Sequence, residues 1–173
     1  GRTWSEDESE FRDLIQTQWY EDGDPEVKTW NKELLDGNKY AGCVTTQLSA
    51  GDNLDYKAHV IELILPKPIL IDSISLFGVD GQDDTKRTAS NDFTVYALEQ
   101  DIKSASGSVF AFPSNASRCS SGSTHNAGGT VKGEHSLVHI PCNLMAKYIY
   151  IYKAPREDTD DKAFLSFCEI EIH

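Results

Sequence analysis

The sequence predicts an all-β sandwich, and three observations lead to that fold class. Short segments in which apolar and polar residues alternate recur along the chain, as strands with one buried face require. Helical periodicity hardly appears, and a possible turn of helix at 32–35 is too short to be stable alone. Segments rich in Gly, Asp, Asn, Ser and Pro separate the apolar runs, which indicates turns and surface loops. The predicted strands lie at 60–65, 70–77, 93–98, 109–112, 137–140, 148–152 and 163–172.

The first of these strands is expected to stop at Pro66, because proline cannot donate a hydrogen bond to a neighbouring strand. The next, 70–77, alternates through Ile74, Ser75 and Leu76, and the strand at 93–98 repeats the pattern. Each run is short, and polar segments separate them. This spacing is typical of a sandwich whose long loops carry recognition.

The last strand carries a cysteine in its middle. Side chains alternate along a strand, so one face is predicted to hold Phe164, Ser166, Cys168, Ile170 and Ile172. The other face then holds Leu165, Phe167, Glu169 and Glu171. Cys168 is therefore predicted to point inward, where it is either buried as a thiol or bonded to Cys43, Cys119 or Cys142.

The cysteine count indicates an oxidising compartment. None of the four cysteines forms a Cys-x-x-Cys pair, which argues against a zinc or thioredoxin-type site. An even number suits two disulfides, and four cysteines allow three pairings. Asn115 begins an Asn-Ala-Ser glycosylation triplet in a polar loop. Together these features predict a secreted protein or the extracellular part of a surface protein.

Net charge argues against two classes of partner. The chain of 173 residues has 28 acidic and 16 basic side chains, a formal charge of -12. Such a balance argues against binding nucleic acid, and it makes binding to an anionic membrane unlikely. No apolar run approaches the length of a membrane span. The length suits one domain, predicted at 12–173 after an acidic N-terminal extension at 1–11.

Catalytic motifs are missing from the sequence. There is no Gly-x-Ser-x-Gly elbow, no His-Glu-x-x-His and no Gly-rich phosphate loop after a strand. The five histidines are scattered, and acidic residues are too numerous for a chosen pair to indicate glycosidic cleavage. We therefore predict that the domain is not an enzyme.

The sequence Asp36-Gly37-Asn38 predicts a tight loop, because Asp and Asn tolerate left-handed backbone and Gly has no Cβ. The segment is either a plain turn or part of a calcium site, which needs a carboxylate and several carbonyl oxygens. If Cys43 bonds Cys168, then Glu169 comes beside Asp36 and supplies a second carboxylate.

Several of these segments resemble the discoidin, or coagulation factor 5/8 type C, superfamily, and most closely its F-type lectin (fucolectin) branch. The resemblance covers roughly residues 12–173 and depends on the order and spacing of its markers. These are 35–38 leading to Gly42-Cys43, the segments 60–65 and 69–77, Asn91 to Val95, the pair Cys119 and Cys142, Lys147 to Ile151, and Leu165 to Glu171.

This resemblance implies an eight-stranded jelly-roll sandwich of the galactose-binding-domain type, with disulfides joining Cys43 to Cys168 and Cys119 to Cys142. It also implies a calcium ion as cofactor. The family's calcium ligands correspond to Glu33, Asp36, Asn38, Gly42, Cys168 and Glu169. Several of these act through backbone carbonyls. Glu33 replaces the usual Asn and Gly42 the usual Ser, while both carboxylates are retained.

The fucose site of the family does not carry over. Thr45 stands where the family has a His. Val79 or Asp80 stands where the family has its first Arg, and Ala89 stands where it has its second. Arginine donors hold sugar hydroxyls with paired hydrogen bonds, and these replacements remove them. Asp83 and Asp84 stand near the position of the family's vicinal cysteines. Lys86 and Arg87 are the basic residues that could substitute.

Ligands are expected at the loop end of the sandwich, formed by 19–25, 44–56, 79–88 and 155–162. Trp19 and Tyr20 either form an aromatic contact surface there or cover the end of the sandwich. We therefore predict an extracellular, calcium-binding recognition module for a glycan or glycoprotein. The alternative is a protein-protein adhesion domain that has lost sugar binding and binds a protein receptor.

Overall fold

The structure is a computed structural model of the whole chain, and it describes residues 11–21, 28–29, 35, 44–45, 59–80, 93–102, 116–119, 135–153 and 165–173. Seven strands are described, and every pairing between them is antiparallel. They are β1 (Gln16–Glu21), β2 (Lys28–Thr29), β3 (Val44–Thr45), β4 (His59–Asp80), β5 (Phe93–Leu98), β6 (His135–Lys153) and β7 (Ser166–Ile172). The predicted all-β class is confirmed. No helix among the described residues is long and apolar enough to cross a membrane.

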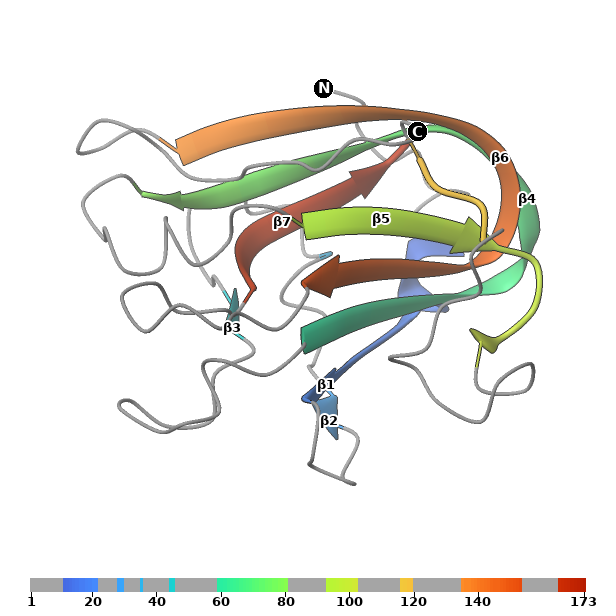
Figure 1. Cartoon of the computed structure of the whole chain (residues 1–173), viewed down its shortest axis with the longest axis horizontal. Helices are drawn as coiled ribbons and strands as arrows, with labels where there is room; N and C mark the ends of the chain where they lie inside the picture. The colour runs from blue at the N-terminus through green and yellow to red at the C-terminus, as the bar shows by residue number, and fades with distance from the viewer. Residues whose placement is uncertain are drawn as a thin grey trace.

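Two layers share the long strands β4 and β6, which bend and double back at one end of the sandwich (Figure 1). In the first layer, 59–64 of β4 pairs with β1 and with 148–153 of β6, which pairs in turn with β5. In the second layer, 69–80 of β4 pairs with 135–146 of β6 and with β7, and β7 pairs with β3. All seven strands therefore form one continuous sheet that folds back on itself.

Two pairs of predicted strands are each one continuous strand that runs through the bend, so the strand ends predicted between them are wrong. The strands expected at 60–65 and 70–77 are one strand, β4, and those expected at 137–140 and 148–152 are one strand, β6. The pairing of β4 with β6 changes register between Ile64 and Ile69 of β4, where the exposed Pro66 and Pro68 lie. Proline interrupts the ladder locally, and the chain turns the corner without a loop. On β6, Asn143 has a φ of 56°, a left-handed conformation that asparagine tolerates.

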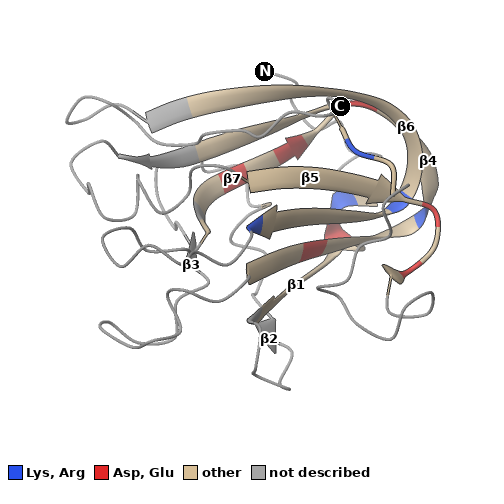
Figure 2. Ribbon diagram, in the orientation of Figure 1, with Lys and Arg blue, Asp and Glu red and all other residues tan. Residues whose placement is uncertain are grey.

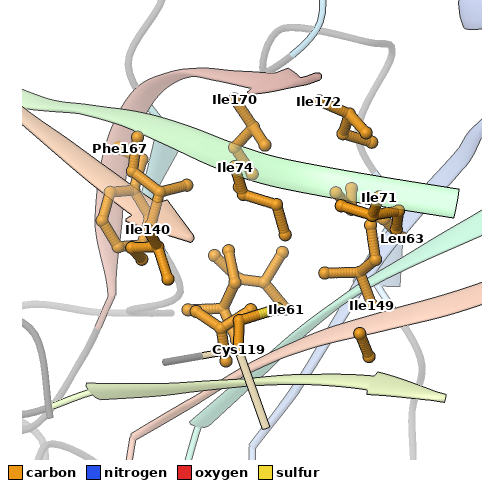
Figure 3. Packing of buried hydrophobic residues seen from close by; sticks show 14 of the residues in the cluster. Ile61, Leu63, Ile71, Ile74, Cys119, Ile140, Ile149, Phe167, Ile170 and Ile172 are labelled. Carbon is orange, nitrogen blue, oxygen red and sulfur yellow. The ribbon is translucent and has the colours of Figure 1, made fainter. Parts of the chain in front are cut away.

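Apolar side chains from both layers fill the space between them (Figure 3). The inward side chains of β5 alternate, while those of β4 change phase at the register shift between Ile71 and Ser73, so that Ile71 and Ile74 both lie in the core and Leu70 is exposed. Phe93 meets Phe167 edge-on with ring centroids 5.4 Å apart. This core includes Ile61, Leu63, Ile74, Val95, Ile149, Ile151 and Ile170. A second cluster, on the outer face of the first layer, contains Tyr20, Val60, Tyr96, Ile102 and Tyr150. The strand predicted at 109–112 lies outside the described residues.

The predicted alternation of β7 is wrong for half of the strand. Phe77 of β4 pairs with Glu169 and Gly78 pairs with Phe167, so Cys168 is an extra residue, a β-bulge. A bulge shifts the side-chain phase by one residue. Leu165 and Phe167 therefore lie in the same core as Ile170 and Ile172. Cys168 is buried, as expected, but so are Glu169 and Glu171, predicted on the face opposite the isoleucines.

Cys119 and Cys142 form a disulfide, with Cα atoms 4.1 Å apart, as the family resemblance implied. The bond fixes residues 116–119 beside β5, where Ala97 N–H donates to Ser117 O and Cys119 N–H donates to Val95 O. Cys168 is also disulfide-bonded. Its expected partner, Cys43, lies outside the described residues, but the residue after it, Val44, pairs with Phe167.

Candidate functional site: the loop end of the sandwich

The ends of the strands gather at the end of the sandwich opposite the bend (Figure 1). In the first layer Glu21 pairs with His59, His59 with Lys153, and Lys153 with Phe93. Each of these four residues is the first or last of its strand. In the second layer β4 ends at Asp80, which pairs with the first residue of β6. This arrangement defines the loop end.

Connections that carry the expected ligand residues therefore begin and end at the loop end. The segment 81–92 joins Asp80 in the second layer to Phe93 in the first, and 154–164 joins Lys153 in the first to β7 in the second. The segment 22–58, which contains β2 and β3, joins Glu21 to His59. Three separate stretches of sequence thus begin and end where the two layers end.

Charged and aromatic side chains form the floor beneath this end. His59 and Phe93 are 0% exposed and Lys153 is 1% exposed, and the three come from adjacent strands. Lys153 supplies a cation at the tip of β6 (Figure 2). A buried ammonium is costly to desolvate unless it is paired or hydrogen-bonded in the folded protein. No local sequence pattern indicates this row, because its residues come from three separate strands.

Trp19 and Tyr20 do not form the exposed aromatic surface considered for them. Trp19 is 5% exposed and belongs to the core between the layers, and Tyr20 is 4% exposed in the outer cluster. They occupy opposite faces of β1 because adjacent strand residues alternate. Both rings pack within the domain, the alternative that the sequence left open.

The structure places only some of the other expected ligand residues. Thr45 ends β3 and Asp80 ends β4, so both backbones reach the loop end, but their side chains lie outside the described part. Asp83, Asp84, Lys86 and Arg87 all fall within 81–92, outside the described residues, as does the glycosylation triplet at Asn115.

Of the six expected calcium ligands, only Cys168 and Glu169 are described. Both are 0% exposed at the bulge in β7. The residue before Asp36, Leu35, is 1% exposed and belongs to the same core as Phe167. The remaining four, Glu33, Asp36, Asn38 and Gly42, lie outside the described residues. Within the described ranges no three His, Cys, Asp or Glu side chains gather as a metal site.

A buried polar network on the outer face of the first layer was missed from sequence. The Gln18 amide donates to Tyr20 Oη at 2.6 Å and to Glu62 Oε1 at 2.8 Å. Burial raises the pKa of the Tyr20 phenol, and the charges of Glu62 and Asp101 raise that pKa further. Burial likewise raises the pKa of Tyr150. The signal available in the sequence was Tyr148, Tyr150 and Tyr152, spaced two apart on one face of a strand.

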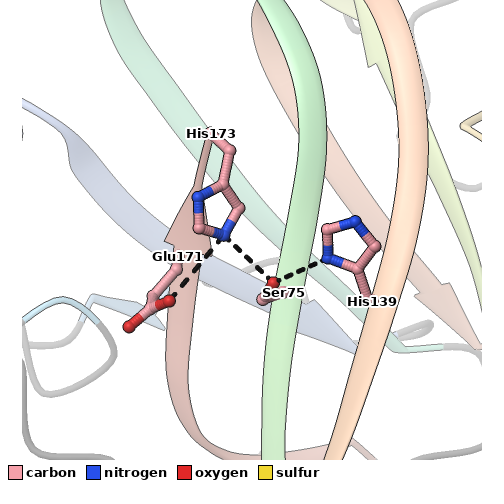
Figure 4. Close-up of polar contacts among 4 residues, drawn as sticks. All are labelled: Ser75, His139, Glu171 and His173. Atoms are coloured by element: carbon pink, nitrogen blue, oxygen red, sulfur yellow. Dashed lines mark hydrogen bonds and ion pairs between the residues drawn. The ribbon is translucent and has the colours of Figure 1, made fainter. Parts of the chain in front are cut away.

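A second polar group, on the outer face of the second layer, combines Ser75, His139, His173 and Glu171 (Figure 4). These residue types also form hydrolytic triads. In a triad the histidine uses one ring nitrogen for the serine and the other for the carboxylate. Here Nε2 of His173 faces both Ser75 Oγ at 3.1 Å and Glu171 Oε2 at 3.7 Å. The group therefore lacks triad geometry, because one nitrogen cannot both accept the serine proton and donate to the carboxylate.

Solved structures share the fold. No protein-family model matches the sequence, and no curated protein matches it. CpGH89CBM32-5 from Clostridium perfringens, solved in complex with GalNAc-beta-1,3-galactose, is 14% identical with a TM-score of 0.55, over 94% of this chain and 96% of that one. The lectin domain of lectinolysin, in complex with Lewis B antigen, is 12% identical with a TM-score of 0.57, over 94% of each chain.

A serum fucolectin from Morone saxatilis, the striped bass, is 17% identical with a TM-score of 0.54, over 82% of this chain and 40% of that one. At these identities the likeness concerns the fold. The chain therefore has the discoidin-like, galactose-binding-domain sandwich that the sequence markers implied. Its structural neighbours are carbohydrate-binding modules and lectin domains, some of which come from enzymes.

Proposed function

We propose that this chain is a non-catalytic, extracellular recognition module that binds a glycan or glycoprotein through its loop end. The observation that carries the proposal is that the strand ends flanking 22–58, 81–92 and 154–164 lie at one end of a fold whose solved examples include glycan complexes. Loops on a rigid sandwich are where such domains place binding residues. The fucose-binding residues of F-type lectins are absent, so a different sugar is expected.

Charge indicates how such a ligand is held. Acidic residues are frequent in the segments of the loop end, while Lys86 and Arg87 are its basic pair in 81–92. Their donors suit sugar hydroxyls or a carboxylate on the ligand. Lys153 in the floor adds a further cation close to the same strand ends. We therefore assign Lys86 and Arg87 as the main polar contacts, with Thr45, Asp80, Asp83 and Asp84 around them.

Calcium is part of the same proposal. The buried Glu169 and the core position of Leu35 support a site in which Asp36 and Glu169 share one ion. Glu33, Asp36, Asn38, Gly42, Cys168 and Glu169 would hold the ion, with several backbone carbonyls among the ligands. The ion would fix the segment before β3 to the bulge in β7, and so stabilise the loop end.

Disulfide bonding supports the extracellular location. Cys119 and Cys142 are bonded, Cys168 is bonded, and no described cysteine is a free thiol. Disulfides persist in oxidising compartments and are rare in the cytosol. We propose Cys43 as the partner of Cys168, because Val44 pairs with Phe167. Glycosylation at Asn115 belongs to the same expectation.

A glycan array with calcium and with EDTA tests this function. We expect binding to a limited set of glycans, lost in a Lys86→Ala/Arg87→Ala variant. The matched control is Lys67→Ala, because Lys67 is exposed at the bend, at the opposite end of the sandwich. Equal loss in the control would show that binding does not use the loop end.

The competing function is a protein-protein adhesion domain on the same scaffold. It is favoured by the absence of the family's sugar-binding residues, with Thr45, Val79 or Asp80, and Ala89 at their positions. A saturable protein partner together with no binding on any glycan would establish this alternative and reject the lectin function.

A further inference from the structure

We propose that the outer edge of β6, at residues 137–141, binds a second copy of this chain, so that the second layers of two copies join in one sheet. In this layer β7 pairs with β4, and β4 pairs with 135–146 of β6. Among the described strands β6 is therefore the last of the layer, and Figure 1 shows it, in orange, along that edge. The corresponding edge of the first layer, at β5, is instead covered by 116–119.

Hydrogen bonds between β4 and the residue after β7 set the direction of the peptide groups in β4. Ser73 N–H donates to His173 O at 3.4 Å, and His173 N–H donates to Ser73 O at 2.9 Å. Both groups of Ser73 therefore point toward β7 and away from β6. Because these directions alternate along an antiparallel strand, Ile74 and Leu76 point their peptide groups toward β6.

Three residues of β6 consequently direct their peptide groups to the open edge. The partners of those two β4 residues are Ile140 and Val138, whose peptide groups point back to β4. The alternating residues Leu137, His139 and Pro141 direct theirs the other way. They present three C=O acceptors but only two N–H donors, because proline has no N–H. No backbone partner for these groups occurs within the part of the chain that the structure describes.

The side chains along this edge suit contact with another copy, because they carry no fixed charge. From 135 to 146 the strand contains no Lys, Arg, Asp or Glu, although 25% of the chain is charged, and Figure 2 shows neither blue nor red there. Leu137, His139 and Pro141 are all exposed. Natural sheets often protect an edge with charged side chains, which oppose pairing. Two chains that each carry a formal charge of -12 can pair here without placing like charges opposite each other.

A two-fold axis at His139 uses every donor of the edge. In this antiparallel register, His139 N–H of each copy donates to His139 O of the other. Leu137 N–H donates to the second copy's Pro141 O, and the symmetry repeats this bond. The missing N–H of proline then leaves only Leu137 O unbonded. The same register places the apolar side chains of Leu137 and Pro141 directly opposite each other.

The length of the edge predicts a weak, reversible dimer. Pairing stops beyond Pro141, because the register of β6 shifts there and Asn143 has a left-handed φ of 56°. So short a contact buries less than about 1,200 Å², which is the range of weak complexes. Since the paired strands run antiparallel, the loop ends of the two copies point in opposite directions. The dimer thus presents two ligand sites at opposite ends, a consequence that rests on the proposed function.

Sedimentation equilibrium over micromolar to millimolar chain concentrations tests the dimer. We expect a reversible equilibrium between monomer and dimer. Its dissociation constant should rise at least about tenfold in Leu137→Lys and in His139→Lys, because each change places charge along the shared edge. The matched control is Leu14→Lys, which adds the same charge at a leucine that is 62% exposed before β1. This variant should keep the wild-type dissociation constant.

His139→Cys tests the position of the axis. Residues of a hydrogen-bonded antiparallel pair have Cα atoms about 5.5 Å apart, which is within the range of a disulfide. Mild oxidation should therefore link two copies of this variant, whereas Leu14→Cys should stay unlinked. Absence of the cross-link in His139→Cys would reject this register.

Two results would overturn the proposal: a wild-type chain that stays monomeric at millimolar concentration, or a dimer that both edge lysine variants leave unchanged. The altered side chains are all exposed, so each variant should fold, and an unaltered urea unfolding midpoint verifies this. Glycan binding should survive in the monomeric variants. Failure of the dimer is therefore separable from failure of the proposed function.

Discussion

Tyr150 donates its phenol hydrogen to Asp101 Oδ1, 2.9 Å away. The same phenol oxygen accepts a hydrogen bond from the backbone N–H of Ile102 at 3.0 Å. Tyr150 lies on β6, while Asp101 and Ile102 follow the end of β5. This one side chain therefore fixes the chain after β5 over the outer face of the first layer.

Replacing Tyr150 by Phe should lower the free energy of unfolding by about 1–3 kcal/mol. The change removes one hydrogen-bond donor and leaves the buried N–H of Ile102 without its acceptor. The ring itself is retained, so no large cavity forms. Urea unfolding measures the difference. Tyr148→Phe is the matched control, since Tyr148 is only half-buried on the same strand face, and it should cost much less.

Stability should fall at alkaline pH because of Tyr20 and Tyr150. Burial raises the pKa of both phenols in the folded protein, while an unfolded tyrosine keeps an ordinary pKa of about 10. The folded state therefore retains protons that the unfolded state loses. This contribution is fully present below about pH 10 and is lost at up to about 1.4 kcal/mol per pH unit per tyrosine above it.

Unfolding at several pH values above 10 tests that dependence. The Tyr20→Phe and Tyr150→Phe variants should each lose stability less steeply with pH than the wild type, because one titrating phenol is gone. The lysines also titrate in this pH range, but they are the same in all three chains, so they do not affect the difference between the slopes of unfolding free energy against pH. Identical slopes in all three chains would show that neither phenol is protected from ionisation.

Phe167→Ala tests the bulge in β7. Because the bulge turns Phe167 into the core against Phe93, the change should cost about 3–5 kcal/mol. The simple alternation predicted from sequence placed this ring opposite the isoleucines. Leu137→Ala on β6 is the control; this side chain is 58% exposed, and its loss should stay within about 0.5 kcal/mol. A small effect at Phe167 would contradict the bulged register.

Alternation along the sequence predicts where strands lie, because one buried face leaves a period of two. It could not predict that β4 continues past Pro66, since that depends on β6 bending beside it. It also missed the extra residue at Cys168, since the register of β7 is set against a strand about 90 residues earlier in the sequence. Both the continuation of β4 and the bulge in β7 depend on pairing between strands far apart in the sequence, which a local sequence pattern does not contain.

The candidate site was predictable only in its location. The sequence predicted one strand to end at Phe77 and the next to begin at Phe93, close to the observed ends at Asp80 and Phe93, so the loop between them could be named. The floor of the loop end could not be predicted from the sequence. Lys153 ends a tyrosine-rich strand, and it is buried only because it pairs with His59 and Phe93. Likewise Glu62 is 0% exposed in an apolar run, and only the fold shows that Gln18 lies across from it.

Removing the Cys119–Cys142 disulfide should lower stability by about 3 kcal/mol. The bond closes a loop with a sequence separation of 23, and cross-linking such a loop restricts the unfolded chain. The double variant Cys119→Ala/Cys142→Ala, unfolded in urea beside the wild type, gives the value. Since Arg118 lies over the ring of Tyr96, 5.2 Å from its centroid, the near-ultraviolet dichroism of tyrosine should also change. A double variant as stable as the wild type would show that the contacts of 116–119 with β5 suffice alone.

Calcium should raise the melting temperature, and Asp36→Asn should abolish the rise. A ligand that binds only the native state stabilises it by about 2.7 kcal/mol at a hundred times its Kd, which is about 5–10 °C for a domain of this size. Asp36 carries one of the two proposed carboxylates, and the change to Asn removes its charge but keeps its size. Asp72→Asn, an exposed aspartate on β4, is the matched control and should keep the full shift. Melting curves in calcium and in EDTA that coincide for the wild type would remove calcium from the proposed function.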